Sequence, residues 1–571
     1  MSDILKKYRY EILLVILFLL SSVMVMFAFQ RTFVRLVFVL ALCCLFVGIY
    51  YLRDTVRKWK NINKTIFFVF IIAIIYSAKA IYSIIIKYSI NSCYGMFGVM
   101  FGLMLICLLE LVYTGLFLKQ WKMEKLFLIS TLLLGPIYMV NLPLNTTPDE
   151  DYHFNSAYKM SSVLMGLNSC EDETYFMRKC DSEYLMPNPN YDFAAMESYL
   201  LTFDDSCGDT SLVSNSTTRV FISRQSAFMY LVPGMGFTIG RLCNVNTTVL
   251  GLMGRMANFL LYLIIGYWAV KKMPFNKLLC YGVLLLPMTL QQCTSLSYDT
   301  IAISLSVFVI SYSFYLFDKQ NITKCEYIVQ SVAMFFLFFT KSKAYFAIAL
   351  FPIFMLILKN RNLFSKYRKV FYFCSVAILV LIVSYIGIAE ISGGNLFYDS
   401  GKTIIIDATE FSGYSFRYCL NHPLEICNLF INTTVQYIYG YVKMMMGEAL
   451  GWVNINAPDV AIFINTLMII LFSIKRKDDH HKVIKGTKIY LSIAILITYA
   501  GILTALLMDY TPYGFSFVYG VQGRYFLPVL IPAMLLIHSN VVEIEEKADK
   551  YLILIFILNA IFTVFSIYPR L

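Results

Sequence analysis

Long apolar runs alternate with short basic loops along the whole chain. The first run begins near Tyr10, continues for about 20 residues, and is followed by many stretches of similar length. Because a helix needs about 20 apolar residues to cross a bilayer, the pattern predicts an all-α polytopic membrane protein. We expect about 15 spans, near residues 10–29, 33–51, 65–86, 96–118, 126–142, 249–269, 278–296, 298–316, 326–340, 344–358, 369–389, 459–474, 487–508, 524–539 and 551–569.

The basic loops predict the orientation of these spans. Cytoplasmic loops carry an excess of Lys and Arg, which places the amino terminus and residues 53–64, 119–125, 271–277, 359–369 and 475–488 inside. Successive spans must place the loops on alternate sides of the membrane. The basic loops all fall on the cytoplasmic side only if the apolar segments 226–242 and 431–447 do not cross the membrane. We expect both to be helices on the outer face. The first of them contains a helix-weakening set, Pro233, Gly234, Gly236 and Gly240.

Two parts of the chain can be separated. Residues 1–125 form a predicted N-terminal membrane block of four helices, in which we find no motif. Residues 126–571 form the predicted core. The core has a long outer loop, 143–225, and a second outer region, 390–458.

Composition agrees with this class of protein. The chain of 571 residues is 59% hydrophobic and only 14% charged, whereas soluble domains carry about 25% charged residues. The basic loops account for the net charge of +12, so we expect no nucleic-acid partner. Of 14 cysteines, Cys170, Cys180 and Cys207 lie in the long outer loop, and we expect Cys170 to pair with Cys180.

The densest acidic cluster follows the fifth predicted span. It reads TTPDEDYHF over residues 146–154 and contains Asp149, Glu150 and His153. One interpretation is a solvated turn or helix cap after Pro148. Another is a general base that takes the proton from an acceptor hydroxyl. Asp149 and Glu150 are also candidate ligands of Mg²⁺ or Mn²⁺, since these ions favour carboxylate oxygens.

Other charged residues are predicted to reach the same outer face. Lys341 and Lys343 could bind a phosphate or extend to the membrane interface. Arg524 could bind a phosphate through two hydrogen bonds or anchor a helix at the interface. Asp299 could cap a helix. Arg255, within a span, requires a carboxylate or phosphate partner. The motifs on this face add four further site candidates: Gln522, Tyr525, Glu448 and Trp452.

Six motifs in a fixed order resemble a known family. They are PDEDYHF, GRMANFL, SYDT, KSKAY, ALGW and QGRYFLP. The order resembles a bacterial integral-membrane family of unknown function, marked by P-D-E-x-x-H and Q-G-R-Y-F-x-P, that is itself similar to GT-C glycosyltransferases. The resemblance extends from about residue 126 to 571. It implies a GT-C-like helix bundle and a polyprenyl-phosphate sugar donor. It also implies inversion at the anomeric carbon, with Asp149 as base and Glu150 in support.

These observations predict a membrane glycosyltransferase. We expect it in the bacterial cytoplasmic membrane, with its active site on the outer face. The acceptor would be a cell-envelope glycan or a teichoic-acid-like polymer, and the donor phosphate would lie near Lys341, Lys343, Arg524 and Arg255. Two alternatives remain: a transporter or flippase of lipid-linked glycans, and a non-catalytic partner in cell-wall polysaccharide assembly.

Overall fold

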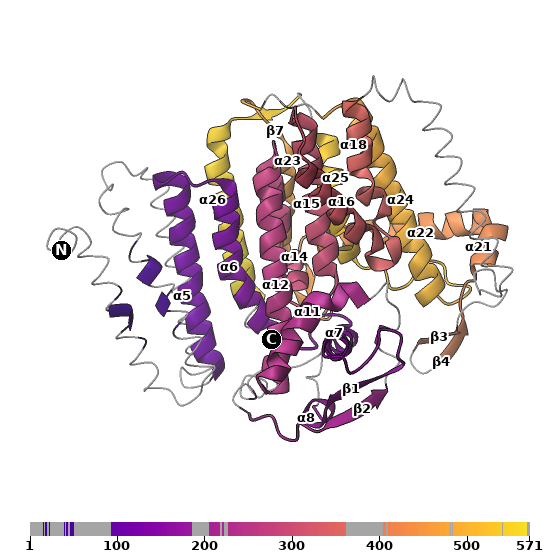
Figure 1. The fold of residues 1–571 in the computed structure, drawn as a ribbon. Coiled ribbons are helices and arrows are strands. Elements are labelled where there is room, and N and C mark those ends of the chain that lie inside the picture. The colour runs from indigo at the N-terminus through magenta and orange to yellow at the C-terminus, as the bar shows by residue number, and fades with distance from the viewer. Residues whose placement is uncertain are drawn as a thin grey trace.

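The fold is a bundle of helices with a cap at one end (Figure 1). The computed structural model describes residues 93–184, 205–216, 227–360 and 409–567 apart from positions 480, 482, 539 and 540, together with residues 403–406 and a few isolated positions. The predicted spans 10–29, 33–51, 65–86 and 369–389 lie outside these ranges. The predicted block of residues 1–125 is therefore described continuously only for its last helix, α5 (Cys93–Tyr113), which continues into the π-helix η2 (Thr114–Leu118).

Within the described ranges, five helices are long and apolar enough to cross a membrane. They are α6 (Met123–Asn141), α12 (Thr247–Lys272), α15 (Asp299–Asp318), α24 (Lys485–Tyr510) and Glu546–Ile567, which contains η8 (Glu546–Ala548) and α26 (Asp549–Ile567). Each coincides with a predicted span. Three shorter helices also overlap predicted spans: α16 (Lys324–Phe339), α23 (Asp459–Ser473) and α25 (Leu527–Ile537).

Two predicted spans are broken helices. Residues 278–296 form α13 (Lys277–Leu284) and α14 (Pro287–Cys293), because Pro287 lacks the N–H that would continue the first helix. Residues 344–358 form α17 (Phe346–Ala349) and α18 (Phe351–Lys359), and Pro352 stands at the corresponding break. The hydrophobic pattern alone did not predict these breaks, because the residues on both sides of each break are apolar.

The core lies around α12 and α15. α15 is buried almost along its full length, and α12 packs against α15, α6 and α11 (Leu231–Leu242). A Cβ added to Gly236 of α11 would lie 2.5 Å from the carbonyl oxygen of Met253 on α12. Only glycine therefore allows this close approach of the two helices.

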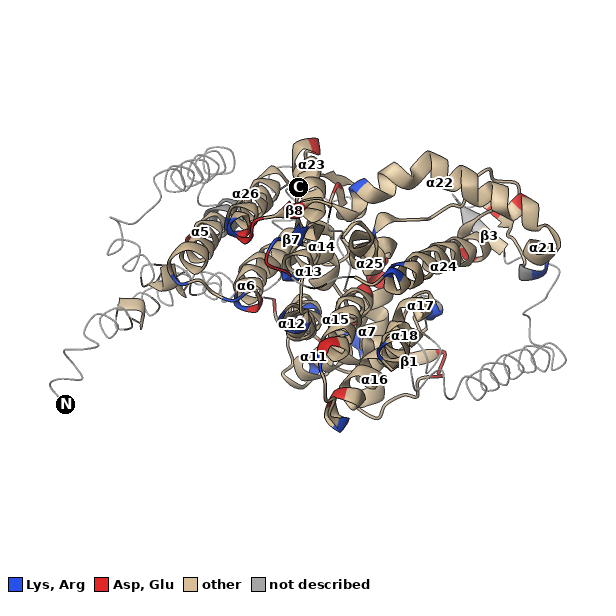
Figure 2. Cartoon of the chain, turned by 90° about the horizontal axis from the view of Figure 1, so that it is seen from above, with Lys and Arg blue, Asp and Glu red and all other residues tan. Residues whose placement is uncertain are grey.

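The two apolar segments that we expected not to cross differ from the bundle helices. α11 has 12 residues and rises only about 18 Å, less than the bilayer core. The segment 431–447 belongs to α22 (Pro423–Met445), which follows the short helix α21 (Phe416–Asn421). Figure 2 looks along the bundle and shows α22 lengthwise, whereas α12 and α15 are seen end-on.

The cap contains α7 (Glu150–Leu164), α8 (Lys179–Ser182) and the antiparallel strands β1 (Thr174–Arg178) and β2 (Leu212–Ser216). The 3-10 helix η4 (Phe228–Tyr230) leads into α11. A second antiparallel pair, β3 (Thr403–Ile406) and β4 (Thr409–Ser412), lies near α21 (Figure 1).

The predicted disulfide between Cys170 and Cys180 is wrong. Cys180 is bonded to Cys207. Pairing of β1 with β2 continues past the strands, since the amide of Cys180 donates to the carbonyl of Asp209 at 2.9 Å, and this brings the two cysteines together. Cys170 is a free, partly buried thiol that packs against a small hydrophobic cluster of the cap, to which Phe221 and Tyr230 belong.

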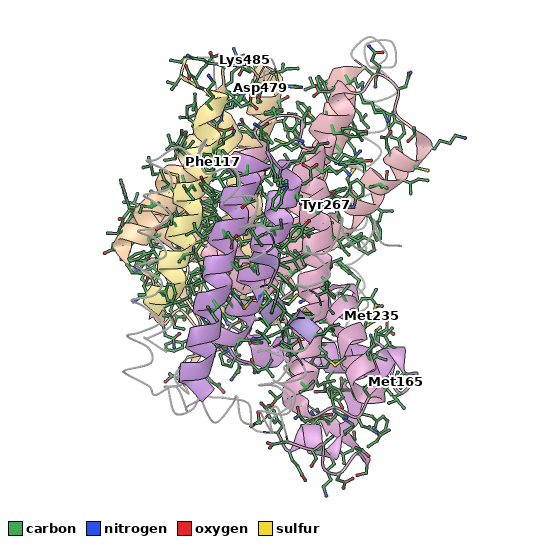
Figure 3. The ribbon with its side chains drawn as sticks, turned by 90° about the vertical axis from the view of Figure 1, so that its left-hand side faces the viewer. Phe117, Met165, Met235, Tyr267, Asp479 and Lys485 are labelled. Carbon is green, nitrogen blue, oxygen red and sulfur yellow. A yellow bond between two sulfur atoms is a disulfide. The ribbon has the colours of Figure 1, made fainter. Side chains whose placement is uncertain are left out.

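The opposite end of the bundle carries a charged connection between distant segments. β7 (Lys475–Arg476) pairs in parallel with β8 (Glu543–Ile544), and Lys475 forms an ion pair with Glu543 at 2.7 Å. Figure 3 shows Asp479 and Lys485 at this end and Met165 and Met235 at the other. The basic loop 475–488 and the acidic motif of α7 are therefore at opposite ends of the bundle.

We expect a cysteine at Ser214 to react with a membrane-impermeant maleimide in intact cells, and a cysteine at Lys485 to react only after permeabilisation. Both positions are exposed and lie at opposite ends of the bundle. The positive-inside rule places the second position in the cytoplasm. The wild-type chain, with its native thiols, supplies the background. The reverse labelling pattern would contradict the orientation.

Candidate functional site

The site begins at the turn before α7. Asp149 is the N-cap residue and has a left-handed backbone with φ of 61°, yet its side chain makes no capping hydrogen bond. The carboxylate is 47% exposed, and its Oδ2 lies 3.5 Å from a terminal nitrogen of Arg524. The acidic residue is thus directed toward a cation and solvent instead of the helix end.

Glu150 has a different environment, although it is the next residue. Its side chain is fully buried and forms a two-point ion pair with Arg255 of α12, at 2.8 Å and 2.6 Å. The amides of Asn145 and Leu296 also donate to its two oxygens, at 2.9 Å and 3.3 Å. Both oxygens are therefore occupied by donors from the protein.

Arg255 is occupied to the same extent. Besides Glu150, its guanidinium donates to the carbonyl oxygens of Met139, Leu142 and Pro143, at the end of α6 and just beyond it. Only 1% of the residue is exposed. The sequence predicted either a carboxylate or a phosphate as the partner of Arg255. In the structure the partner is the carboxylate of Glu150. These contacts argue against the predicted roles of Arg255 in phosphate binding and Glu150 in catalysis.

Asp299 and Lys341 continue the site from Asp149. Asp299 is the first residue of α15 and is buried, with 4% exposed. Lys341, in the 3-10 turn η5 (Lys341–Lys343), donates to its Oδ1 at 2.9 Å. The same ammonium lies 3.5 Å from the ring centroid of Tyr525, which is within the range of a cation–π contact.

Arg524 links the two carboxylates. It belongs to the 3-10 helix η7 (Gly523–Phe526), and its Nε lies 3.9 Å from Asp299 Oδ2. A Cβ at Gly523 would lie 2.3 Å from the carbonyl oxygen of Tyr441, so glycine lets η7 pack tightly on α22. The hydroxyl of Tyr345 also donates to the carbonyl of Tyr525 at 2.9 Å and holds the same turn.

The hydrogen bonds of Arg524 are poor for a buried cation. It is only 5% exposed, and its hydrogen bonds to Gln292 and to the hydroxyl of Tyr525 are both 3.4 Å long. Among the described residues, its buried Nε has no hydrogen-bond partner. A buried donor without a partner costs about 1–3 kcal/mol. An anion at this place would satisfy it.

Helix starts from distant parts of the chain meet around this cation. α7, α15 and α25 begin at Glu150, Asp299 and Leu527, next to or within the group of charges. The N-terminus of a helix carries a partial positive charge and unpaired N–H groups, both of which favour anions. The arrangement therefore adds to the attraction that Lys341 and Arg524 exert on an anion.

Three charged residues of the site have a left-handed backbone. Asp149, Lys341 and Lys343 all have positive φ angles, of 61°, 43° and 68°. Such a conformation costs of order 1–3 kcal/mol for a residue other than glycine and is commonly retained at functional sites. Lys343 is exposed at the edge of the site.

His153 lies in an aromatic wall behind Asp149. It is one turn further along α7, and its Nδ1 lies 2.9 Å from the hydroxyl of Tyr230. Its ring meets that of Tyr298 edge to face at 5.0 Å. Burial lowers the pKa of His153 to about 4, against the opposing effect of Asp149 and Asp299. The imidazole is therefore neutral at neutral pH.

A small hollow opens beside Arg524. It is lined by Pro148, Gln292, Gln522 and the turn between β5 (Ala449–Leu450) and β6 (Ile455–Asn456). Gly451 of that turn is held through its backbone by Gln291 at 2.9 Å and 3.1 Å. Trp452 is half-buried in the turn, and Glu448 pairs with Lys443 of α22. These two predicted site residues lie beside the hollow's lining and not in the group of charges.

The donor set does not fit the predicted Mg²⁺ or Mn²⁺. Both oxygens of Glu150 accept hydrogen bonds from Arg255 and the backbone, and Asp149 faces Arg524. Among the described residues, no three His, Cys, Asp or Glu side chains form a group that could hold a metal ion.

Three site residues were not identified from the sequence: Tyr230, Gln292 and Tyr298. The sequence did contain an indication for Gln292, because two adjacent glutamines at 291–292 interrupt an apolar stretch. A polar residue in such a position commonly has a functional partner. Tyr298 stands in the SYDT motif, next to Asp299, but was not singled out, and Tyr230 carried no signal, since the chain has 42 tyrosines.

Comparison with known proteins gives a family but no activity. Neither the curated proteins nor the solved structures contain a match to this chain. The family whose model matches is described as predicted membrane protein (DUF2142), and the match covers residues 132–533, from α6 through η7 into α25. It therefore includes Asp149, Asp299, Lys341 and Arg524. The chain belongs to the DUF2142 family of predicted membrane proteins.

Proposed function

We propose that this protein is an inverting glycosyltransferase that moves a sugar from a polyprenyl-phosphate donor to a cell-envelope acceptor. One observation carries the proposal: the half-exposed carboxylate of Asp149 lies 3.5 Å from Arg524, a buried cation whose Nε has no hydrogen-bond partner among the described residues. A base and an anion-binding group are thus adjacent. The order of sequence motifs, similar to that of a family resembling GT-C glycosyltransferases, supports the same chemistry.

The proposed step uses each group once. The acceptor hydroxyl gives its proton to Asp149, and its oxygen forms a bond to the anomeric carbon of the sugar. The bond between that carbon and the phosphate oxygen breaks, and its electron pair leaves with the polyprenyl phosphate. Arg524 and Lys341 stabilise the negative charge that develops on the phosphate. Attack from the face opposite the leaving group inverts the anomeric centre.

Donor binding and activation of the base are coupled in this scheme. The contact between Asp149 and Arg524 is long, at 3.5 Å, and half of the carboxylate is exposed. A phosphate would compete with Asp149 for Arg524, because it accepts two hydrogen bonds from a guanidinium. The bound donor would leave the carboxylate available to accept the proton.

The remaining charges support the site. Asp299 holds Lys341 at 2.9 Å and so positions its ammonium. Glu150 and Arg255 tie the turn before α7 to α6 and α12, which sets the position of Asp149. In this proposal neither Glu150 nor Arg255 touches the substrate.

We place the site on the outer face of the bacterial cytoplasmic membrane. The basic loop 475–488 is at the opposite end of the bundle, which favours a cytoplasmic position for that end. The disulfide between Cys180 and Cys207 belongs to the cap around the site, and disulfides persist in oxidising compartments. The acceptor is accordingly a surface glycan or a teichoic-acid-like polymer.

Arg524→Ala should weaken donor binding by roughly tenfold to a hundredfold, because a hydrogen bond to a charged group contributes about 1.5–3 kcal/mol. Arg524→Lys should retain only part of the affinity, since an ammonium lacks the two-point geometry. Binding of a polyprenyl-phosphate sugar to purified protein tests this, with the exposed Arg417→Ala as control. Unchanged donor affinity in Arg524→Ala would show that Arg524 does not bind the donor phosphate. Movement of the donor across proteoliposomes without sugar transfer would favour a flippase.

A further inference from the structure

Asn258 of α12 holds the turn that leads into α15. It stands three residues after Arg255, in the same GRMANFL motif, so the two side chains are neighbours on the surface of the helix. Its amide Nδ2 donates to the carbonyl oxygens of Ser295 and Ser297, at 3.0 Å and 3.4 Å. Only 1% of the residue is exposed. One helix thus holds both turns of the site: Arg255 the turn before α7, and Asn258 the turn before α15.

The turn connects Asn258 to Asp299 through Ser297. The hydroxyl of Ser297 accepts a hydrogen bond from the amide of Asp299 at 3.2 Å. The carbonyl oxygen of Ser297 accepts another from the hydroxyl of Thr300 at 2.9 Å. Ser297 is therefore bound on one side by Asn258 and on the other by the first residues of α15. A shift of Ser297 would move the carboxylate of Asp299.

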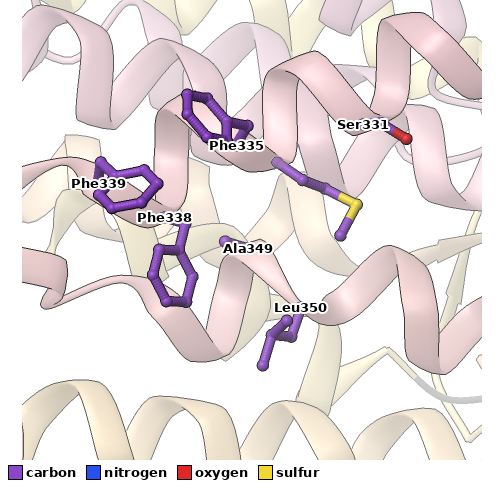
Figure 4. Close-up of a pocket in the computed structure, with 7 residues that line it drawn as sticks. Ser331, Phe335, Phe338, Phe339, Ala349 and Leu350 are labelled. Carbon is purple, nitrogen blue, oxygen red and sulfur yellow. The ribbon is translucent and has the colours of Figure 1, made fainter. Parts of the chain in front are cut away.

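Asp299 in turn holds Lys341. Among the described residues it is the only ion-pair partner of Lys341, at 2.9 Å. The groove between α16 and α17, the two helices that flank η5 in the sequence, offers no alternative partner, because its lining residues are apolar apart from Ser331 (Figure 4). Asp299 also lies 3.9 Å from Nε of Arg524. A displaced Asp299 would therefore disturb both cations of the site.

Stability alone does not account for an asparagine at this place. Among the described residues, the buried Oδ1 of Asn258 has no hydrogen-bond partner. A buried polar atom without a partner lowers stability, and polar residues within spans commonly serve a function. What asparagine supplies here, and an apolar residue of the same shape would not, is the pair of hydrogen bonds to the turn.

We infer that Asn258 is a positioning residue of the donor phosphate site. Through the turn of residues 295–297 it keeps Asp299, and with it Lys341, where the phosphate binds. The inference rests on the proposed function, because that function puts the donor phosphate at Lys341 and Arg524. Asn258 itself does not touch the donor.

Asn258→Leu keeps the branched shape of the side chain and removes its donor group. Affinity for farnesyl phosphate, an isoprenyl phosphate without a sugar, should fall roughly threefold to tenfold, because part of the contact between Lys341 and the phosphate is lost. Ser297→Ala breaks the next link in the same path and should have the same effect. The transfer rate at saturating donor should stay close to that of the wild type, since Arg255 still holds the turn with Asp149.

Asn559→Leu is the matched control. Asn559 is a buried asparagine of α26 that donates to the carbonyl of Ala461 at 2.9 Å, and its Oδ1 also has no partner among the described residues. The same exchange there should leave the affinity unchanged. Asp299→Asn should weaken binding by itself, and adding Asn258→Leu to it should weaken binding no further. Two fully additive losses would overturn the inference, because Asn258 would then act by a route other than Asp299.

A labelling experiment without any ligand separates this inference from the proposed function. Acetylation of Lys341 by acetic anhydride, measured by mass spectrometry relative to the exposed Lys343, should be faster in Asn258→Leu and Ser297→Ala than in the wild type. If these variants release Lys341 and bind farnesyl phosphate more weakly, but the wild type transfers no sugar, the positioning role stands and the transferase is wrong. If both variants fold and keep the wild-type affinity, the positioning role is wrong, whatever the transfer assay shows.

Discussion

Asp149→Asn should reduce sugar transfer by about 10²–10⁴-fold while donor binding changes little. The amide keeps the size of the side chain and removes the base. Because Asp149 makes no capping hydrogen bond, the substitution should not shorten α7. The measurement is the transfer rate from a synthetic polyprenyl-phosphate sugar at saturating donor, together with the dissociation constant of the donor.

Asp205→Asn is the matched control for this substitution. It makes the same exchange in the same outer loop, at an exposed position. It should transfer sugar at the wild-type rate. A wild-type rate in Asp149→Asn would show that Asp149 is not the base. A large loss of donor binding in this variant would assign Asp149 to binding instead of proton transfer.

Glu150→Gln should destabilise the protein by about 3–5 kcal/mol, the usual cost of breaking a buried ion pair. The substitution leaves the guanidinium of Arg255 charged, 2% exposed and without its carboxylate. The expected result is a large fall in the melting temperature of the protein in detergent. Donor binding and transfer should fall only in proportion to the folded fraction.

Glu545→Gln is the control for the buried pair. Glu545 pairs with Lys477 at 3.2 Å, but both side chains are more than half exposed. Such a pair contributes only about 0.2–1 kcal/mol. A fall in transfer in Glu150→Gln at full stability would show that Glu150 contributes to the reaction itself, either in catalysis or through the position of Asp149.

Much of the helix pattern could be predicted from the sequence. α12 and α15 coincide with the predicted spans 249–269 and 298–316, because a long apolar run leaves the backbone no alternative in lipid. The predicted order of sides also placed Asp149, Asp299, Lys341 and Arg524 on one face. The structure brings these four into one row of contacts.

The sequence did not determine which residues pair with each other in ion pairs and disulfides. Glu150 and Arg255 are 105 positions apart, and their pairing depends on how the turn before α7 packs against α12. Adjacent carboxylates therefore looked equivalent, although one is buried and the other half-exposed. The cysteine pairing depended on the register of β1 and β2, which the spacing of the cysteines does not determine.

A structure of the protein with a non-hydrolysable polyprenyl phosphonate sugar tests the central claim most directly. The account predicts that the phosphonate lies within hydrogen-bonding distance of Arg524 Nε and near Lys341. It also predicts that the anomeric carbon faces the carboxylate of Asp149. A phosphonate bound at any other place, with Arg524 still facing Asp149 as at present, would contradict it.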